Sequence, residues 1–407
     1  MNKTQLKNYA KLIAQKGLNI QKGQDCVIEC EFDQPEFIHI LTKEIYKLGA
    51  RRVFVEWSSQ VTQKLTYKYC SEKTLSRLES FEEEKWRWRA ENLPAMCYII
   101  SEDPEGLNGI NQEKMTNSKM ARNRVIKPYR DKMEAGYQWC IAAVPGEKWA
   151  KKVFPNDKKS VAINKLWDAI LTCSRADTDP IIAWEEHNKN LKKRCEYLNS
   201  QNLTALRYIS SNGTNLTVGL NEIGIFTGGA EKTLSGVEFN PNIPSEEIFT
   251  SPKAGVCEGI VYSTKPLSYD GLIIDNFSLK FENGKVAEVK AEKNQELLEK
   301  IVKMDEGASM LGECALVPFD SPINNSKILF YETLFDENAC CHLALGKGFS
   351  ECIKGFENMS LQERREKGLN ESMIHVDFMI GSKDLKIVGI KSDGSEILIF
   401  NEGNWAF

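Results

Sequence analysis

The stretch IHVDFMIG at residues 374–381 places an imidazole and a carboxylate two positions apart in an otherwise apolar run. Side chains alternate between the two faces of a β-strand, so His375 and Asp377 would share one face. The apolar side chains of the other face would anchor the strand in a core. Because imidazole nitrogens and carboxylate oxygens both bind divalent metal ions, the stretch raises the question of a metal site.

Three other short patches in the second half of the chain carry the same residue types. They are NIPSEEIFTSP (242–252) with Glu246 and Glu247, LGECALVP (311–318) with Glu313, and LFDENACCHLALGKGF (334–349) with Asp336, Glu337 and His342. Four carboxylates and two imidazoles would suit two divalent ions that share a bridging carboxylate, namely Glu247, Glu313, Glu337, Asp377, His342 and His375. Two neighbouring ions can hold a water and polarise a carbonyl, which is hydrolytic chemistry.

Each patch also has an ordinary structural explanation. Asp336 is typical of an N-cap, and the helix it starts would run through ENACCHLALG and end near Gly346. His342 on such an apolar helix would usually be a hydrogen-bonded core residue. Glu313 and Asp377 are harder to explain in this way, because an unpaired buried carboxylate is costly. The residues alone leave both interpretations open.

Other chemistries find little support in the chain. No GxSxG, GxGxxG or P-loop pattern occurs, and Cys341 next to His342 has no special geometric meaning. The net charge is −4, and the basic stretch 114–132 contains a single aromatic residue, Tyr129, so we expect a solvated helical face there. Neither a nucleic acid nor a membrane is an expected partner.

Two domains are expected from the order of the elements. Helices are predicted at 4–16, 35–50 and 180–199, and strands at 25–32, 52–57, 95–103 and 137–145. This alternation indicates an α/β domain with a mostly parallel sheet, at residues 1–198. Residues 199–407 are strand-rich, with hairpins through Asn283-Gly284 and Asp393-Gly394 and helices at 294–310 and after Asp336. They predict an α+β domain that carries the metal site.

The compartment is expected to be the cytoplasm. The first residues, MNKTQLKNYAKLIAQKG, have no apolar core of a signal peptide, and no stretch approaches the roughly 20 apolar residues of a membrane span. The twelve cysteines are scattered and form no CxxC pair, which favours reduced, buried thiols.

Several of these stretches resemble the M29 family of metallo-aminopeptidases. The resemblance lies in NIPSEEIFTSP, STKPLSYDG (263–271), ECALVPFDSPI (313–323), LFYETLFDENACCHLALG (329–346) and IHVDFMIG, and extends to GTNLTVGL (213–220), GLNIQKGQ (17–24) and EKWAKKVFP (147–155). It covers essentially the whole chain in order. It implies a cytosolic, homodimeric exopeptidase that removes N-terminal residues from peptides with two divalent ions, zinc or cobalt, with manganese or magnesium as alternatives.

Carried over by motif, the resemblance implies six metal ligands, with Glu313 at the bridging position: Glu247, Glu313, Glu337, His342, His375 and Asp377. We expect a metal-bound hydroxide near Glu313 to attack the carbonyl. Glu246 is a possible general base, although strand alternation would turn it away from the face of Glu247. An alternative is a mononuclear iron dioxygenase with a triad of His342, His375 and Asp377, which the three retained glutamates disfavour.

One position departs from the family pattern. The family usually has HxAxGxAY, whereas this chain has HLALGKGF, so Phe349 replaces a tyrosine that lies at the metal site in the family. Phenylalanine has no hydrogen-bond donor, and losing one donor to the reaction intermediate can cost about a hundredfold in rate. Either another group serves, such as Tyr331, a water or a metal, or the chain is a slow or altered amide hydrolase.

Overall fold

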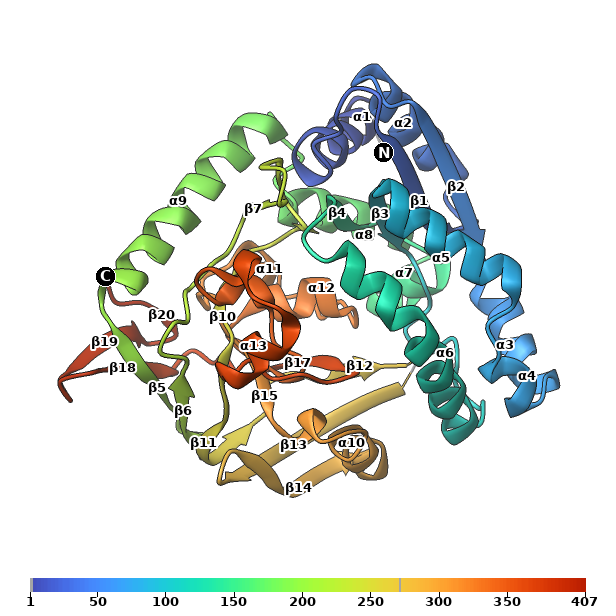
Figure 1. Cartoon of the computed structure of the whole chain (residues 1–407). Coiled ribbons are helices and arrows are strands. Elements are labelled where there is room, and N and C mark those ends of the chain that lie inside the picture. The colour runs from blue at the N-terminus through green and yellow to red at the C-terminus, as the bar shows by residue number, and fades with distance from the viewer. Residues whose placement is uncertain (1–2, 271) are drawn as a thin grey trace. The chain divides into compact units, whose positions relative to one another are not determined.

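The computed structural model describes residues 3–270 and 272–407 (Figure 1). Gly271, which ends the STKPLSYDG stretch, lies outside the described residues. The chain divides into two compact units: one holds the residues up to Glu186 and Ala230–Pro244, and the other holds His187–Gly229 and Ser245–Phe407. The division falls between Glu186 and His187, in the first half of helix α9 (Pro180–Ser200), whereas the sequence placed it at residue 198, near the end of that helix. A continuous helix gives no compositional sign of such a change, and the returning segment is too short to show a pattern.

The first unit is built on a five-stranded parallel sheet. Its strand order is β2 (Arg52–Ser58), β1 (Asp25–Glu31), β3 (Ala95–Ile100), β4 (Trp139–Ala143) and β9 (Asn242–Ile243). The first four match the predicted strands, and β9 comes from the returning segment. The expected parallel α/β architecture is confirmed.

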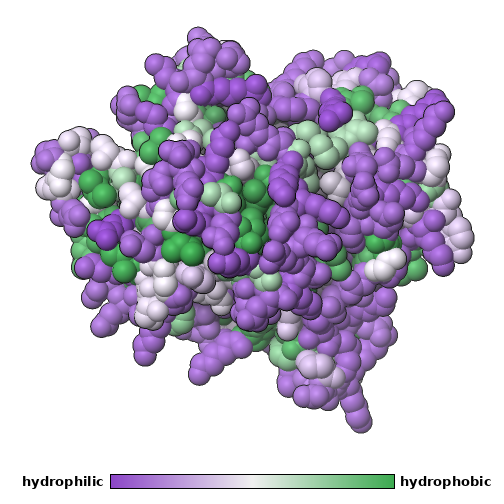
Figure 2. Space-filling model, turned by 90° about the horizontal axis from the view of Figure 1, so that it is seen from below, coloured by the Kyte–Doolittle hydropathy of each residue, from purple (hydrophilic) through white to green (hydrophobic). Residues whose placement is uncertain are grey.

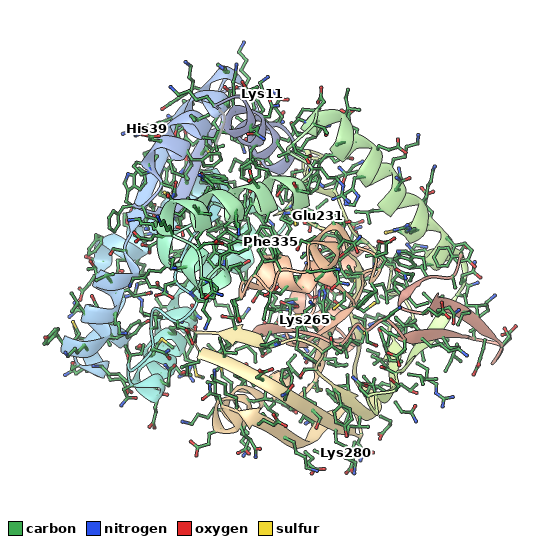
Figure 3. The ribbon with its side chains drawn as sticks, turned by 180° about the vertical axis from the view of Figure 1, so that it is seen from behind. Lys11, His39, Glu231, Lys265, Lys280 and Phe335 are labelled. Atoms are coloured by element: carbon green, nitrogen blue, oxygen red, sulfur yellow. The ribbon has the colours of Figure 1, made fainter. Side chains whose placement is uncertain are left out.

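Helices connect the strands of the first unit. They are α1 (Lys3–Leu12), α2 (Pro35–Lys47), α3 (Gln60–Tyr69), α4 (Glu72–Ser76), α5 (Ser80–Asn92), α6 (Gln112–Met133), α7 (Glu147–Val153) and α8 (Lys159–Cys173). Packing of α1, α2 and α8 is aromatic: the ring centroid of Phe37 lies 5.5 Å from Tyr9 and 5.6 Å from Trp167. His39, on α2, is exposed, as expected of a surface histidine (Figure 3).

The second unit contains a large, mainly antiparallel sheet. Its strands are β5 (Leu203–Ile209), β6 (Asn215–Leu220), β11 (Pro252–Tyr262), β12 (Leu267–Tyr269), β13 (Leu272–Glu282), β14 (Lys285–Lys293), β18 (Lys386–Lys391), β19 (Glu396–Asn401) and β20 (Asn404–Trp405). Both predicted hairpins are confirmed, as β13–β14 and β18–β19. At the first turn Asn283 and Gly284 both have positive φ, 52° and 77°, which suits a tight hairpin. The helix predicted at 294–310 is α10 (Gln295–Val302), followed by a short 3₁₀ turn at Gly307–Ser309.

A smaller antiparallel sheet lies in the same unit. Its order is β10 (Ile248–Thr250), β15 (Leu311–Leu316), β16 (His342–Gly346) and β17 (His375–Met379). Strand β17 is the predicted IHVDFMIG strand.

The prediction of a helix after Asp336 is wrong. Helix α12 (Thr333–Asp336) ends there, a 3₁₀ turn follows at Glu337–Ala339, and the chain then enters β16. All residues of β16 are buried, so the strand lacks the polar alternation that distinguishes a strand from a short apolar helix. Asp336 is not an N-cap: its carboxylate accepts the backbone N–H groups of Phe330 at 2.9 Å and Glu332 at 3.2 Å.

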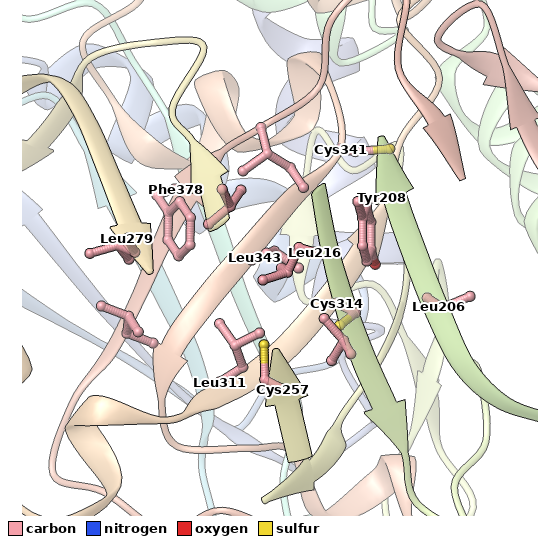
Figure 4. Packing of buried hydrophobic residues seen from close by; sticks show 14 of the residues in the cluster. Leu206, Tyr208, Leu216, Cys257, Leu279, Leu311, Cys314, Cys341, Leu343 and Phe378 are labelled. Atoms are coloured by element: carbon pink, nitrogen blue, oxygen red, sulfur yellow. The ribbon is translucent and has the colours of Figure 1, made fainter. Parts of the chain in front are cut away.

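One face of the small sheet is buried in the core of the second unit (Figure 4). Cys314 of β15, Leu343 of β16 and Phe378 of β17 pack there with Leu216 and Tyr208 of the large sheet. This core fixes the strands from behind and leaves their other face for polar side chains. Across the described residues, we find no helix that combines the length and the apolar character required to span a bilayer.

Truncating this core should destabilise the unit that carries the small sheet. Phe378 is fully buried, and its ring centroid lies 5.8 Å from that of Phe277. Phe378→Ala should lower the free energy of unfolding by about 3–5 kcal/mol, because the lost contacts leave a cavity. Chemical denaturation would measure the change, with Leu398→Ala as the control because Leu398 is 40% exposed. Equal effects of both substitutions would contradict the packing described.

Candidate metal centre

Strand register places four of the predicted ligands on one face of the small sheet. Glu313 on β15 and Asp377 on β17 both pair with Ala344 of the central strand, one from each side. Residues paired across strands point to the same face, so the two carboxylates flank a small methyl group. His342 lies two positions before Ala344, and His375 lies two positions before Asp377. Alternation therefore puts both imidazoles on this face as well.

Two further carboxylates reach the same place from the ends of strands. Glu247 immediately precedes β10, and Glu337 lies in the 3₁₀ turn before β16. Both are buried, as is Glu313, which is only 3% exposed. Within the described part of the chain, ligand atoms lie within 4.8 Å of one another in three overlapping groups: Glu247, Glu313 and His342; Glu313, His375 and Asp377; and Glu337, His342 and Asp377. All six predicted ligands are thus brought together.

Backbone carbonyls orient both imidazoles. Nδ1 of His342 lies 2.9 Å from the carbonyl oxygen of Glu337, and Nδ1 of His375 lies 2.7 Å from that of Lys347. A carbonyl can only accept, so each Nδ1 must carry the proton. In the neutral rings Nε2 is then left with a lone pair. This tautomer is the one that suits metal binding through Nε2.

The Nε2 atoms point at carboxylate oxygens. Nε2 of His342 lies 3.3 Å from Oε2 of Glu247, and Nε2 of His375 lies 3.2 Å from Oε2 of Glu313 and 3.0 Å from Oδ1 of Asp377. That Oδ1 is buried and has no hydrogen-bond partner among the residues that the structure describes. Lone pairs facing carboxylates repel one another unless a proton or a metal ion lies between them. The donor set, carboxylate oxygens and imidazole nitrogens, fits divalent ions such as zinc or cobalt.

Without a cation the cluster would hold protons instead. Burial raises the pKa of Glu313 to about 7 and the pKa of Glu337 well above its usual value, and the charge of Asp377 adds to both shifts. Burial alone would lower the pKa of His342, but the hydrogen bond and charge of Glu247 raise it to about 9. These opposite tendencies reflect negative charge crowded in a region of low polarity.

Glu246 and Phe349 have different surroundings from the ligands. Glu246 is in none of the three groups, and its Oε2 lies 4.0 Å from Nε2 of His187 on α9. The geometry therefore gives no support to Glu246 as a general base. The ring centroid of Phe349 lies 4.7 Å from that of His375 and 5.3 Å from that of Phe249, so Phe349 borders the site.

Sequence reasoning did not identify Asn338, which is fully buried and hydrogen-bonded to two ligand-bearing segments. An amide directly after Glu337 was the only available sign of it.

Comparison with known proteins agrees with this geometry. The family described as thermophilic metalloprotease (M29) matches residues 2–405. The chain belongs to the M29 metalloprotease family. Aminopeptidase AmpS of Bacillus subtilis is 41% identical over 410 residues, which cover 99% of this chain and 98% of the relative. Aminopeptidase T of Thermus thermophilus is 35% identical over 405 residues, with the same coverage of 99% and 98%.

A solved structure extends the comparison to three dimensions. Wild-type AmpT from Thermus thermophilus matches with a TM-score of 0.90 at 34% identity, over 100% of both chains. M29 membership confirms the expected family and enzyme class, a metal-dependent hydrolase of the aminopeptidase kind. The structural match confirms the expected fold class, an α/β part followed by a strand-rich part.

Bound metal should stabilise this protein through Glu313. An ion that binds only the folded state at about 100 times its dissociation constant adds about 2.7 kcal/mol to the free energy of unfolding. Glu313→Gln should remove most of that gain, because Glu313 belongs to two of the three groups. Thermal unfolding with and without added zinc would measure it, with the exposed Glu396→Gln as a control. Full stabilisation of Glu313→Gln by zinc would exclude Glu313 as a ligand.

Proposed function

We propose that this protein is a cytoplasmic aminopeptidase that removes N-terminal residues from peptides with two divalent ions. One observation carries the proposal: four carboxylates and two imidazoles, whose Nε2 atoms face carboxylate oxygens, converge on one face of a small sheet. One ion alone does not need six ligands. The relatives named aminopeptidase support the same activity.

Glu313 is the residue that we propose to lie between the two ions. One group of neighbouring ligand atoms contains Glu313, Glu247 and His342, and another contains Glu313, His375 and Asp377. Glu313 therefore faces both imidazoles. Asp377 is also grouped with each histidine, but the family resemblance places Glu313 at the bridging position. Its buried carboxylate can also accept a hydrogen bond from the attacking water.

The chemistry divides between the ions and the chain. When bound, the two ions would polarise the scissile carbonyl, bind the free α-amino group and lower the pKa of a water. The chain fixes the two imidazoles through backbone carbonyls and holds the carboxylates in a buried region from which bulk water is largely excluded. Both effects keep the reacting groups in place and strengthen electrostatic interactions with them.

Activity should require both a metal and a free α-amino group. Aminoacyl-p-nitroanilides should be hydrolysed after addition of zinc or cobalt, and a chelator should abolish the reaction. The matched N-acetylated p-nitroanilides are the control and should not be hydrolysed, because they lack the free amine. The measurement is the release of p-nitroaniline.

Two outcomes would overturn the peptidase proposal. The first is no hydrolysis with any divalent metal. The second is one iron per chain with consumption of oxygen, which would favour the mononuclear dioxygenase. The geometry disfavours that alternative: none of the three groups within the described residues contains both histidines, which its triad requires.

Phe349 cannot donate a hydrogen bond to the reaction intermediate. Its ring instead packs against the ring of His375, a proposed ligand. Tyr331 is one candidate for an alternative donor, and the residues on either side of it, Phe330 and Glu332, donate backbone N–H groups to Asp336. We propose that another group, such as Tyr331, a water or an ion, replaces the missing hydroxyl.

Adding a hydroxyl at this position should therefore change the rate little. Phe349→Tyr should change kcat by much less than the roughly hundredfold increase expected if the chain lacked a necessary donor. Phe349→Leu is the comparison, because it removes the ring that packs on His375. A rise of about a hundredfold in kcat for Phe349→Tyr would show that this chain is a slow hydrolase for want of that hydroxyl.

We also propose that the protein works as a homodimer. Val61, Leu65 and Tyr69 are exposed along α3, where they recur every four residues and form an apolar stripe. The face drawn in Figure 2 is largely hydrophilic, with hydrophobic groups in patches. The cytoplasmic assignment is supported by twelve cysteines that are all free, eleven of them buried.

A further inference from the structure

Asn338 connects two segments that carry proposed ligands. Its Oδ1 accepts the backbone N–H of Glu246 at 2.7 Å, which fixes the residue immediately before Glu247. Its Nδ2 donates to the carbonyl of Leu334 at 2.9 Å and to Oε1 of Glu337 at 3.3 Å. Asn338 is 0% exposed, so these bonds form without competition from bulk water.

The bonds of Asn338 form part of a closed ring. From Glu337 the ring continues through its carbonyl to Nδ1 of His342, at 2.9 Å. Nε2 of His342 faces Oε2 of Glu247 at 3.3 Å, and Glu247 follows the Glu246 N–H that Asn338 binds. Glu246 contributes only its backbone N–H, so Asn338 supplies the only side chain in the ring that is not a proposed ligand. His375 is outside the ring, since its Nδ1 is held by Lys347.

The chemistry of the amide suits this place. The N–H of Glu246 can only donate, and the carbonyl of Leu334 can only accept, so the orientation of the amide is fixed by its partners. An amide supplies one acceptor and two donor hydrogens without adding charge. A carboxylate here would keep the acceptor but would repel Glu337. An apolar residue would leave the buried N–H of Glu246 without a partner.

We propose that Asn338 is a positioning residue that holds Glu247 and Glu337 in place for one of the two ions. The inference rests on the two-ion function proposed above and extends it to a residue that binds neither metal nor substrate. The ring contains Glu247, Glu337 and His342 but not His375. Loss of Asn338 therefore weakens the binding of one ion and leaves unchanged the binding of the ion on the side of His375 and Asp377.

Metal titration of variants tests this asymmetry. In wild-type protein, competition with a chromophoric chelator should show two bound zinc ions per chain. Asn338→Leu should lower the affinity for one of the two zinc ions by about 10–100-fold, which is the loss typical of removing a partner that orients metal ligands. The other affinity should stay within about twofold. In a titration with cobalt, the visible spectrum of the variant should differ from that of the wild type only for the one equivalent of cobalt whose binding is weakened. This signal does not depend on activity.

Two further variants keep the test decisive. Asn338→Asp has the same size and retains the acceptor for Glu246, so it decides the question if Asn338→Leu does not fold. Asn338→Asp should lower the affinity for the same ion, because a carboxylate cannot make the two hydrogen bonds that the amide donates. Asn199→Leu is the control for the hydrogen-bond pattern: Asn199 is exposed, but its amide also bonds a backbone N–H and a carbonyl, those of Phe226 at 2.8 and 2.9 Å. It should bind two ions with wild-type affinities.

The outcomes separate this inference from the proposed function. Two ions bound with wild-type affinity and an unchanged cobalt spectrum in both Asn338 variants would overturn the role of Asn338 alone. An equal loss of affinity for both ions would also overturn it, because a general loss of protein stability would affect both sites alike. Fewer than two ions bound to the wild-type protein would overturn the two-ion function itself.

Discussion

Mutual repulsion among four closely spaced carboxylates, three of them buried and one half-buried, is the constraint on which this structure depends. Glu247, Glu313, Glu337 and Asp377 are held together in a region with little water, and two imidazoles present lone pairs toward them. Protein interiors tolerate such an arrangement only when positive charge compensates it or when the carboxylates take up protons. The rest of the second unit supplies the rigid frame that keeps these groups together against their repulsion. A structural role alone would have been served better by apolar residues.

The frame is a small antiparallel sheet with two unlike faces. Its apolar face packs into a core shared with the large sheet, so the strands cannot rotate or slip in register (Figure 4). Its polar face presents Glu313 and Asp377 on either side of Ala344. Segments outside the strands then add Glu247 and Glu337, and Asn338 ties these two segments together. Strand register thus sets the positions of Glu313 and Asp377, and the hydrogen-bonded ring holds Glu247 and Glu337.

The sequence allowed some of this to be predicted and hid the rest for physical reasons. Strand β17 was predictable because the two faces of a half-buried strand differ in polarity, which is visible as alternation. Strand β16 was not, because a strand buried on both faces is apolar throughout and resembles a short helix. The hairpins were predictable from Asn-Gly and Asp-Gly turns, which are local. The end of the first unit within α9 and the ring through Asn338 depend on contacts between distant segments, which no local pattern records.

The central claim is that six side chains hold two ions around Glu313. Anomalous X-ray diffraction from crystals soaked in zinc tests it most directly, because each ion gives its own peak. The account predicts two peaks, both within coordination distance of Glu313, one next to Nε2 of His342 and one next to Nε2 of His375. A single peak, or peaks that avoid Glu313, would contradict it.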